Sequence, residues 1–236
     1  MGLLEAVVFD VDGTLVDSER DGHRLAFNAA FEEAGLTDRW DVATYGRLLR
    51  ITGGTRRLAA WFEAKGAPAG HARELATRLH RRKTEIMRQL IEDGHVRARP
   101  GVGQLLDDLD AEGVQVHVAT TGARAWVEPL LDRVFGPRFR TVVTGTEVTE
   151  LKPSPAAYLR VLELAGCSPE RTVAVEDSAN GVRAAVGAGL RCVAAYNDYT
   201  RDDDLSSAVL VADGFTDPAL VAWFHQRLPR RWRGRP

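Results

Sequence analysis

Residues 7–19, VVFDVDGTLVDSE, place a short apolar run directly before two closely spaced carboxylates. The run at residues 7–9 is rich in β-branched and aromatic side chains, which is typical of a strand that a parallel sheet buries on both faces. Asp10 and Asp12 follow where this strand is predicted to end. Because side chains alternate along an extended chain, both carboxylates are expected to point beyond the carboxyl edge of the sheet. Open α/β sheets bind their ligands at that edge.

The residues after the strand favour a phosphate site with a metal ion. Gly13 and Thr14 are predicted to turn the chain, and Ser18 to cap a helix that begins near Glu19. Two carboxylates this close repel each other unless a proton or a cation intervenes, and oxygen ligands suit magnesium. A carboxylate can also accept a phosphoryl group as a nucleophile. The hypothesis is magnesium-assisted phosphoryl transfer through Asp10, and the alternative is a plain turn after a strand.

The stretch at residues 7–19 resembles the first motif of the haloacid dehalogenase-like phosphatase superfamily. Three further motifs of that superfamily have counterparts here in the expected order. Thr120 ends the run VQVHVAT, Lys152 lies in ELKPSP, and Glu176 and Asp177 lie in TVAVEDSANG. The resemblance covers most of the chain and implies a phosphoric monoester hydrolase that uses Mg²⁺ as its cofactor.

The resemblance also implies a role for each motif residue. Asp10 would attack phosphorus, while Asp12 would protonate the leaving oxygen and then activate the hydrolytic water. Relatives that cleave carbon–halogen or carbon–phosphorus bonds generally lack an acid at the position of Asp12, so its presence favours phosphate esters. Thr120 would donate a hydrogen bond to a phosphoryl oxygen, Thr121 would contact the substrate, and Lys152 would supply positive charge. The implied metal ligands are Asp10, Asp12 through its backbone carbonyl, Glu176 and Asp177.

Runs outside the four motifs resemble the CbbY branch of the superfamily, whose members are phosphatases of sugar bisphosphates, notably xylulose 1,5-bisphosphate. These runs are DSERDGHRLAFNAAF, YGRLL, ITGGTRR, LHRRKTE, EDSANGVRAAVGAGLRCV and NDYTRDD. By this resemblance, Glu19 and His23 would meet the sugar. A pocket for the distal phosphate would be shaped by Tyr45, Gly53, Gly54 and Arg57, because glycine amides and an arginine suit a dianion.

One departure from the CbbY pattern leaves alternatives open. Thr55 stands where CbbY-like chains commonly carry lysine, and Arg56 follows it. Either the positive charge has moved one position along, or the distal group is different or absent. A phosphomutase of the β-phosphoglucomutase type and a phosphoglycolate phosphatase share the same core motifs. A non-catalytic sensor of a phosphorylated ligand is the remaining alternative, although all the core motif residues are present.

The pattern of apolar residues predicts two regions. Helical spacing without strands extends over residues 17–95, with helices expected to Gly35 and at 42–50, 55–65 and 72–92. Helices and strands alternate from residue 102, which predicts a doubly wound, parallel, Rossmann-like α/β sheet. The expected domains are an α/β core of residues 1–16 and 97–228, an inserted all-helical cap of residues 17–96, and a basic tail of residues 229–236.

The composition sets limits on partners and location. Hydrophobic residues make up 44% and charged residues 27% of the 236 residues, and the formal net charge is −2. Such a balance gives no reason to expect nucleic acid or a membrane as a partner. The opening MGLLEAVVFD has no secretory pattern, and Cys167 and Cys192 are too few for a disulfide framework. We therefore expect a monomeric, cytoplasmic enzyme that acts on a small molecule.

Overall fold

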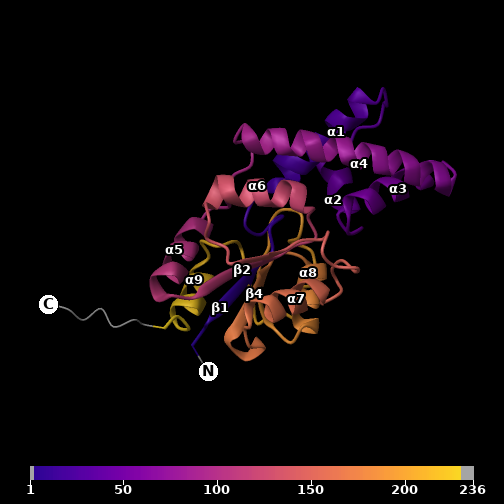
Figure 1. The fold of residues 1–236 in the computed structure, drawn as a ribbon. Helices are drawn as coiled ribbons and strands as arrows, with labels where there is room; N and C mark the ends of the chain where they lie inside the picture. Colours follow the sequence, from indigo (N-terminus) through magenta and orange to yellow (C-terminus); the bar gives the residue numbers. More distant parts are fainter. Residues whose placement is uncertain (1–2, 230–236) are drawn as a thin grey trace.

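The structure, a computed structural model, describes residues 3–229 (Figure 1). Within these residues, six parallel strands form one sheet in the order β3-β2-β1-β4-β5-β6. The strands are β1 (Ala6–Phe9), β2 (Gln115–Ala119), β3 (Thr141–Val143), β4 (Thr172–Glu176), β5 (Arg191–Ala195) and β6 (Leu210–Ala212). Strand β1 lies between β2 and β4, so its carboxyl end opens at the centre of the sheet edge. The predicted doubly wound parallel sheet is confirmed.

Helices cover both faces of the sheet (Figure 1). One face packs against α5 (Val102–Glu112), α6 (Arg124–Phe135) and α9 (Pro218–His225), and the other against α7 (Ala156–Ala165) and α8 (Ala179–Gly187). A 3₁₀ turn, η2 (Pro169–Arg171), precedes β4. Along β1, Val7 and Phe9 join the first apolar cluster and Val8 joins the second. This alternation explains why β1 is apolar at every position.

Residues 17–96, which we call the cap segment, are helical. They contain a π-helical turn, η1 (Glu19–His23), followed by α1 (Arg24–Glu33), α2 (Val42–Leu48), α3 (Gly54–Ala64) and α4 (Ala69–Glu92). Phe27, Phe31, Trp40, Tyr45 and Leu58 form the buried centre of an apolar cluster within this segment. The expectation of helices without strands is confirmed for residues 17–96, whereas the exact domain boundaries stay a prediction.

Two chain connections join the cap segment to the sheet, and they lie side by side. Val16 forms an isolated antiparallel bridge with Ala98, and Arg99 N donates to Leu15 O at 3.0 Å. Helix α4 also packs against α6, with Met87 in the apolar cluster of the sheet. The predicted linkers near residues 15–18 and 97–101 are therefore paired with each other.

Some expectations need correction or fall outside the described residues. Ser18 does not cap the next helix: its side chain makes no capping hydrogen bond and instead donates to Asp12 Oδ1. The segment that follows is a π-helical turn, which sequence periodicity does not distinguish from an α-helix. The predicted basic tail lies almost wholly outside the described residues. Cys167 and Cys192 are free thiols, and no helix of residues 3–229 has the length and apolar character to cross a membrane.

Candidate active site

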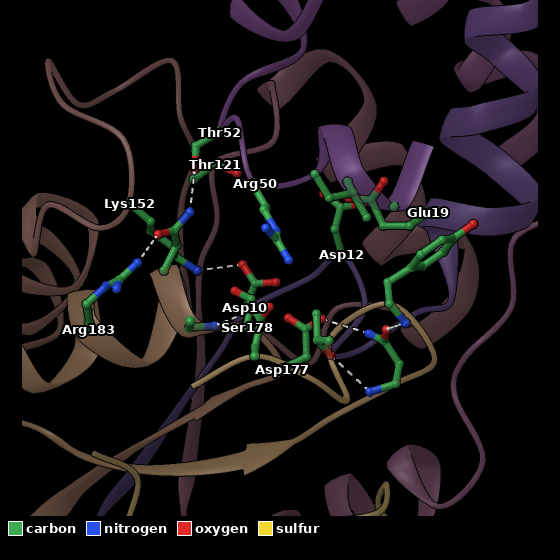
Figure 2. A pocket seen from close by; sticks show the side chains of 18 of the residues that line it. Asp10, Asp12, Glu19, Arg50, Thr52, Thr121, Lys152, Asp177, Ser178 and Arg183 are labelled. Carbon is green, nitrogen blue, oxygen red and sulfur yellow. Dashed lines mark hydrogen bonds and ion pairs between the residues drawn. The ribbon is translucent and has the colours of Figure 1, made fainter. Parts of the chain in front are cut away.

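The four motif segments meet at the carboxyl edge of the sheet. Asp10 follows β1, Thr120 follows β2, and Asp177 follows Glu176 at the end of β4. Because these three strands are adjacent and in register, their carboxyl ends bring the motif residues together. Lys152, from the loop before α7, completes the group. Figure 2 shows Asp10, Lys152 and Asp177 around one cavity of about 580 Å³.

Lys152 joins two of the acids. Its Nζ lies 2.5 Å from Asp10 Oδ1 and 2.5 Å from Glu176 Oε1, and Tyr158 donates to the same Glu176 oxygen at 2.7 Å. Burial acts to lower the pKa of Lys152, but the two carboxylates hold it above its usual range. Lys152 is therefore an ammonium that fixes the predicted nucleophile. The bond between Lys152 and Pro153 is cis, which the sequence did not indicate.

One lysine does not neutralise the acids around it. Burial raises the pKa of Asp10 to about 8, and the charges of Glu176 and Asp12 act in the same direction, while Lys152 opposes them. The pKa of Asp177 is raised well above its usual value by burial and then by Glu176 and Asp10. Burial and the neighbouring carboxylates thus both disfavour the ionised acids, and a bound cation would favour them.

The donor set fits magnesium. Asp10, Glu176 and Asp177 each offer one carboxylate oxygen, and these oxygens lie within 4.8 Å of one another. All three residues are buried, and hard oxygen donors suit Mg²⁺ better than zinc or copper. The Asp12 carboxylate is not in this group, and its predicted ligation through the backbone carbonyl stays a prediction.

Asp12 is held by a hydrogen-bonded chain that enters the cap segment. Its Oδ1 accepts from Ser18 and lies 2.8 Å from His23 Nε2, while His23 Nδ1 lies 2.7 Å from Lys83 Nζ on α4. Burial acts to raise the pKa of Asp12, but His23, Ser18 and Lys83 together lower it below its usual value. Asp12 thus rests as a carboxylate whose orientation is fixed by the cap segment.

Thr120 and Thr121 follow β2 at the carboxyl edge of the sheet. Thr120 is buried and its Oγ1 accepts from Gly122 N at 3.0 Å, which leaves the hydroxyl hydrogen free to donate. Thr121 lines the cavity (Figure 2). The geometry is compatible with the predicted roles of both threonines in binding substrate.

Glu19 is positioned by two predicted ligands of the distal phosphate. Tyr45 is fully buried and donates to Glu19 Oε2 at 2.5 Å. Arg57 donates to Tyr45 Oη at 3.2 Å and to Leu48 O at 3.0 Å. In this structure Tyr45 and Arg57 hold the Glu19 carboxylate at the cavity, and their direct contact with a substrate stays a prediction. Of the glycine pair, Gly53 lines the main cavity and Gly54 a neighbouring pocket that contains His23.

Three exposed arginines at the cavity were missed from the sequence. They are Arg47, Arg50 and Arg183. In Figure 2, Arg50 points into the cavity on the side of Asp10. Arg183 donates to Asn180, whose Nδ2 donates to Thr52 Oγ1 of the cap segment at 3.0 Å. The position of Arg50 just before the glycine pair was the available signal for this arginine.

The role of Lys83 at the site was also missed from the sequence, although a lysine among the apolar positions of a helix is informative. The buried positions of α4 are Ala72, Ala76, Leu79, Lys83, Met87 and Ile91. A lysine on the apolar stripe of a helix needs a polar partner, because burying an unpaired ammonium is costly. The larger apolar residues of α4, Leu75, Leu79, Ile86 and Leu90, predict a different stripe, and of these four only Leu79 is buried.

A family model, curated proteins and a solved structure match this chain over most of its length. The family model of haloacid dehalogenase-like hydrolases matches residues 4–189. The chain is 40% identical to a CBBY-like protein of Arabidopsis thaliana over 92% of this chain and 70% of that protein. It is also 40% identical to the protein CbbY of Cereibacter sphaeroides over 91% of this chain and 94% of that protein. A crystal structure of CbbY from Rhodobacter sphaeroides with xylulose-(1,5)bisphosphate aligns with a TM-score of 0.83 and 38% identity, covering 90% of this chain and 95% of that one.

The matched family model spans all four motifs, three of which follow adjacent strands at the carboxyl edge of the sheet. The chain therefore belongs to the haloacid dehalogenase-like hydrolase family, and its relatives indicate that it is a phosphatase.

Proposed function

We propose that this chain is a magnesium-dependent phosphatase of a sugar bisphosphate, in particular a pentulose bisphosphate such as xylulose 1,5-bisphosphate. One observation carries the proposal: a single cavity joins the buried Asp10 to the exposed guanidinium groups of Arg47, Arg50 and Arg183. A substrate with two phosphates suits a cavity that is lined by a reactive carboxylate and by several arginines. The similarity to CbbY proteins supports the same substrate class.

The first chemical step forms an aspartyl-phosphate. A carboxylate oxygen of Asp10 forms a bond to phosphorus while the bond from phosphorus to the sugar oxygen breaks. Asp12, after taking up a proton, gives it to the departing sugar oxygen. Lys152 holds the Asp10 carboxylate, and the positive charge of Lys152 stabilises the negative charge on the phosphoryl oxygens. The hydroxyl of Thr120 donates a hydrogen bond to one of these oxygens. Magnesium bound by the acids would offset further negative charge on the phosphoryl group.

The second step regenerates Asp10. Asp12, now a carboxylate again, takes a proton from water as that water attacks phosphorus, and the bond from phosphorus to Asp10 breaks. His23 and Ser18 keep the Asp12 carboxylate oriented for both proton transfers. Such general acid and base catalysis typically contributes about 10²–10⁴ in rate.

Phosphate release across a panel of substrates tests this proposal. The panel contains xylulose 1,5-bisphosphate, xylulose 5-phosphate, β-glucose 1-phosphate and phosphoglycolate, each measured with Mg²⁺ and with EDTA. We expect the pentulose bisphosphate to have the highest kcat/KM and EDTA to abolish release. Conversion of β-glucose 1-phosphate to glucose 6-phosphate, or a preference for phosphoglycolate, would assign a different substrate to the same core.

A further inference from the structure

The run NDYT, residues 197–200, follows β5 and takes no part in the chemistry described above. Asn197 contacts Asp177, and Tyr199 contacts the cap segment. We propose that this run is a positioning element that holds the metal ligand Asp177 and couples it to the position of the cap segment. The proposal rests on the proposed function, since it assumes magnesium at the acidic group.

The amide of Asn197 is fixed in one orientation. Its Nδ2 donates to Asp177 Oδ2 at 2.7 Å and to Gly13 O at 3.2 Å, and its Oδ1 accepts from Tyr199 N at 2.8 Å. If the amide turned over, its oxygen would face the carboxylate and the carbonyl, and its NH₂ group would face the Tyr199 N–H. The donor on Oδ2 fixes the rotamer of Asp177, whose Oδ1 accepts from Thr14 Oγ1 at 3.4 Å.

Gly13 and Arg99 also keep the contact between Asn197 and Asp177 in place. Gly13 has a φ of 78°, and a Cβ there would clash with Asp177 Oδ2 and approach Asn197 Nδ2 to 2.7 Å. Arg99, in the second linker, donates to Gly13 O, to Ala195 O at 2.8 Å and to Tyr196 O at 2.7 Å. One guanidinium thus ties the turn after Asp12 to the end of β5, so that Asn197 meets Asp177 in a rigid frame.

Tyr199 connects the run NDYT to the cap segment by packing against it. Its ring centroid lies 6.1 Å from that of Tyr45 on α2, and the ring packs against the apolar cluster of the cap segment. Gly46 of α2 lies close to the same ring, since a Cβ there would lie 3.0 Å from Tyr199 Cδ1. Movement of the cap segment would remove this packing from Tyr199. If the packing orders the run, then by thermodynamic linkage magnesium binding and closure of the cap segment favour each other.

Calorimetric titration of the EDTA-treated, full-length protein with Mg²⁺ tests the proposal. Asn197→Ser replaces the amide that reaches Asp177 Oδ2 by a shorter hydroxyl and is expected to raise Kd for Mg²⁺ by about 10-fold or more, as for other residues that orient metal ligands. Tyr199→Ala, which touches no ligand, is expected to raise Kd by about 5-fold. Tyr199→Phe keeps the ring and should keep the wild-type Kd.

A matched control separates positioning from general stability. Thr172→Val removes a buried hydroxyl that donates to Ser168 O at 2.8 Å, at the opposite edge of the sheet, so it should lower Tm without changing Kd. A wild-type Kd in folded Asn197→Ser or in Tyr199→Ala overturns the proposal. If Asn197→Ser does not fold, the comparison of Tyr199→Ala with Tyr199→Phe decides. Failure of the wild-type chain to bind Mg²⁺ would instead contradict the proposed function and, with it, the premise of this inference.

Discussion

The side chain of Asp10 is buried beside a lysine and two further acids, which suits a nucleophile and costs stability. Replacement by asparagine should lower kcat by about 1,000-fold or more, since an amide oxygen does not replace the attacking carboxylate. The variant should fold, because it removes a carboxyl group whose pKa burial raises to about 8. Phosphate release and thermal melting check this prediction. Substantial residual turnover in a folded Asp10→Asn protein would contradict the nucleophile assignment.

Lys83 is expected to act on Asp12 through His23. Burial lowers the pKa of Lys83 from 10.5 to about 8, with the carboxylates of Asp12 and Glu19 opposing the shift. The ammonium is therefore present below pH 8 and lost as the pH rises through that value. We expect kcat of the wild type to fall above pH 8, because the chain that orients Asp12 loses its charged end.

A substitution at Lys83 tests this role. Lys83→Met should lower kcat by about 10-fold to 100-fold and remove the decline above pH 8. Lys65→Met, which removes an exposed lysine of the cap segment paired with Asp38, is the matched control and should change neither. A pH–rate profile of Lys83→Met that keeps the wild-type decline would show that another group is responsible.

At this scale the sequence predicted residues that belong to contiguous motifs, and it missed residues whose partners are distant. Asp10, Thr120, Lys152 and Asp177 each lie in a recognisable run at a strand end or loop. Lys83 lies 60 positions from His23, and Asn197 20 positions from Asp177. Periodicity and spacing describe neighbours along one element, so a contact between side chains of different elements is visible only after folding.

Among the elements, the loop between α2 and α3 is expected to bind the second phosphate of the proposed substrate, since it carries Arg50. Arg50 is exposed and points into the cavity, whereas Arg57 is only 7% exposed and is bonded to Tyr45 and Leu48. Arg50→Ala should therefore raise KM for a bisphosphate by about 10-fold and leave KM for a monophosphate nearly unchanged. Arg57→Ala should impair both substrates, since it releases Tyr45 and Glu19.

Steady-state kinetics with xylulose 1,5-bisphosphate and xylulose 5-phosphate check this pair of predictions. Arg56→Ala is the control, because Arg56 is an exposed neighbour that does not line the main cavity. Selective loss of bisphosphate binding in Arg57→Ala, with no effect in Arg50→Ala, would mean that Arg57 and not Arg50 binds the distal phosphate.

Most elements were predictable because their apolar patterns are uniform. Strand β1 is buried at all four positions, and the buried residues of α4 recur at helical spacing from Ala72 to Ile91, with Lys83 among them. The exception is η1, where the chain widens into a π-helical turn as Ser18 bonds to Asp12 instead of capping the helix. Such turns are frequent at functional sites, and here the turn carries both Glu19 and His23.

For the whole molecule, contacts across the cavity connect the cap segment to the sheet. Asn180 of α8 donates to Thr52 of the cap segment across 128 positions of sequence. Thr52→Val keeps the shape but removes the acceptor, so it should raise KM by about 5-fold, the effect of one hydrogen bond. The increase should be equal for mono- and bisphosphates, since closure of the cap segment affects both.

Kinetic comparison with Thr77→Val checks this prediction. Thr77 bonds only to Arg73 O within α4, so its replacement should leave KM unchanged. A change in Thr52→Val confined to bisphosphates would mean that Thr52 contacts the distal phosphate instead of stabilising closure.

In the proposed function, one cavity binds both phosphates of a sugar bisphosphate, and the buried Asp10 attacks one of them. The most direct test is the ratio of kcat/KM for xylulose 1,5-bisphosphate to that for xylulose 5-phosphate, measured with saturating Mg²⁺. Two charge-assisted phosphate contacts at the distal end predict a ratio of about 100 or more. A ratio near one would rule out recognition of a second phosphate, because the arginines of the cavity would then contribute nothing to substrate choice.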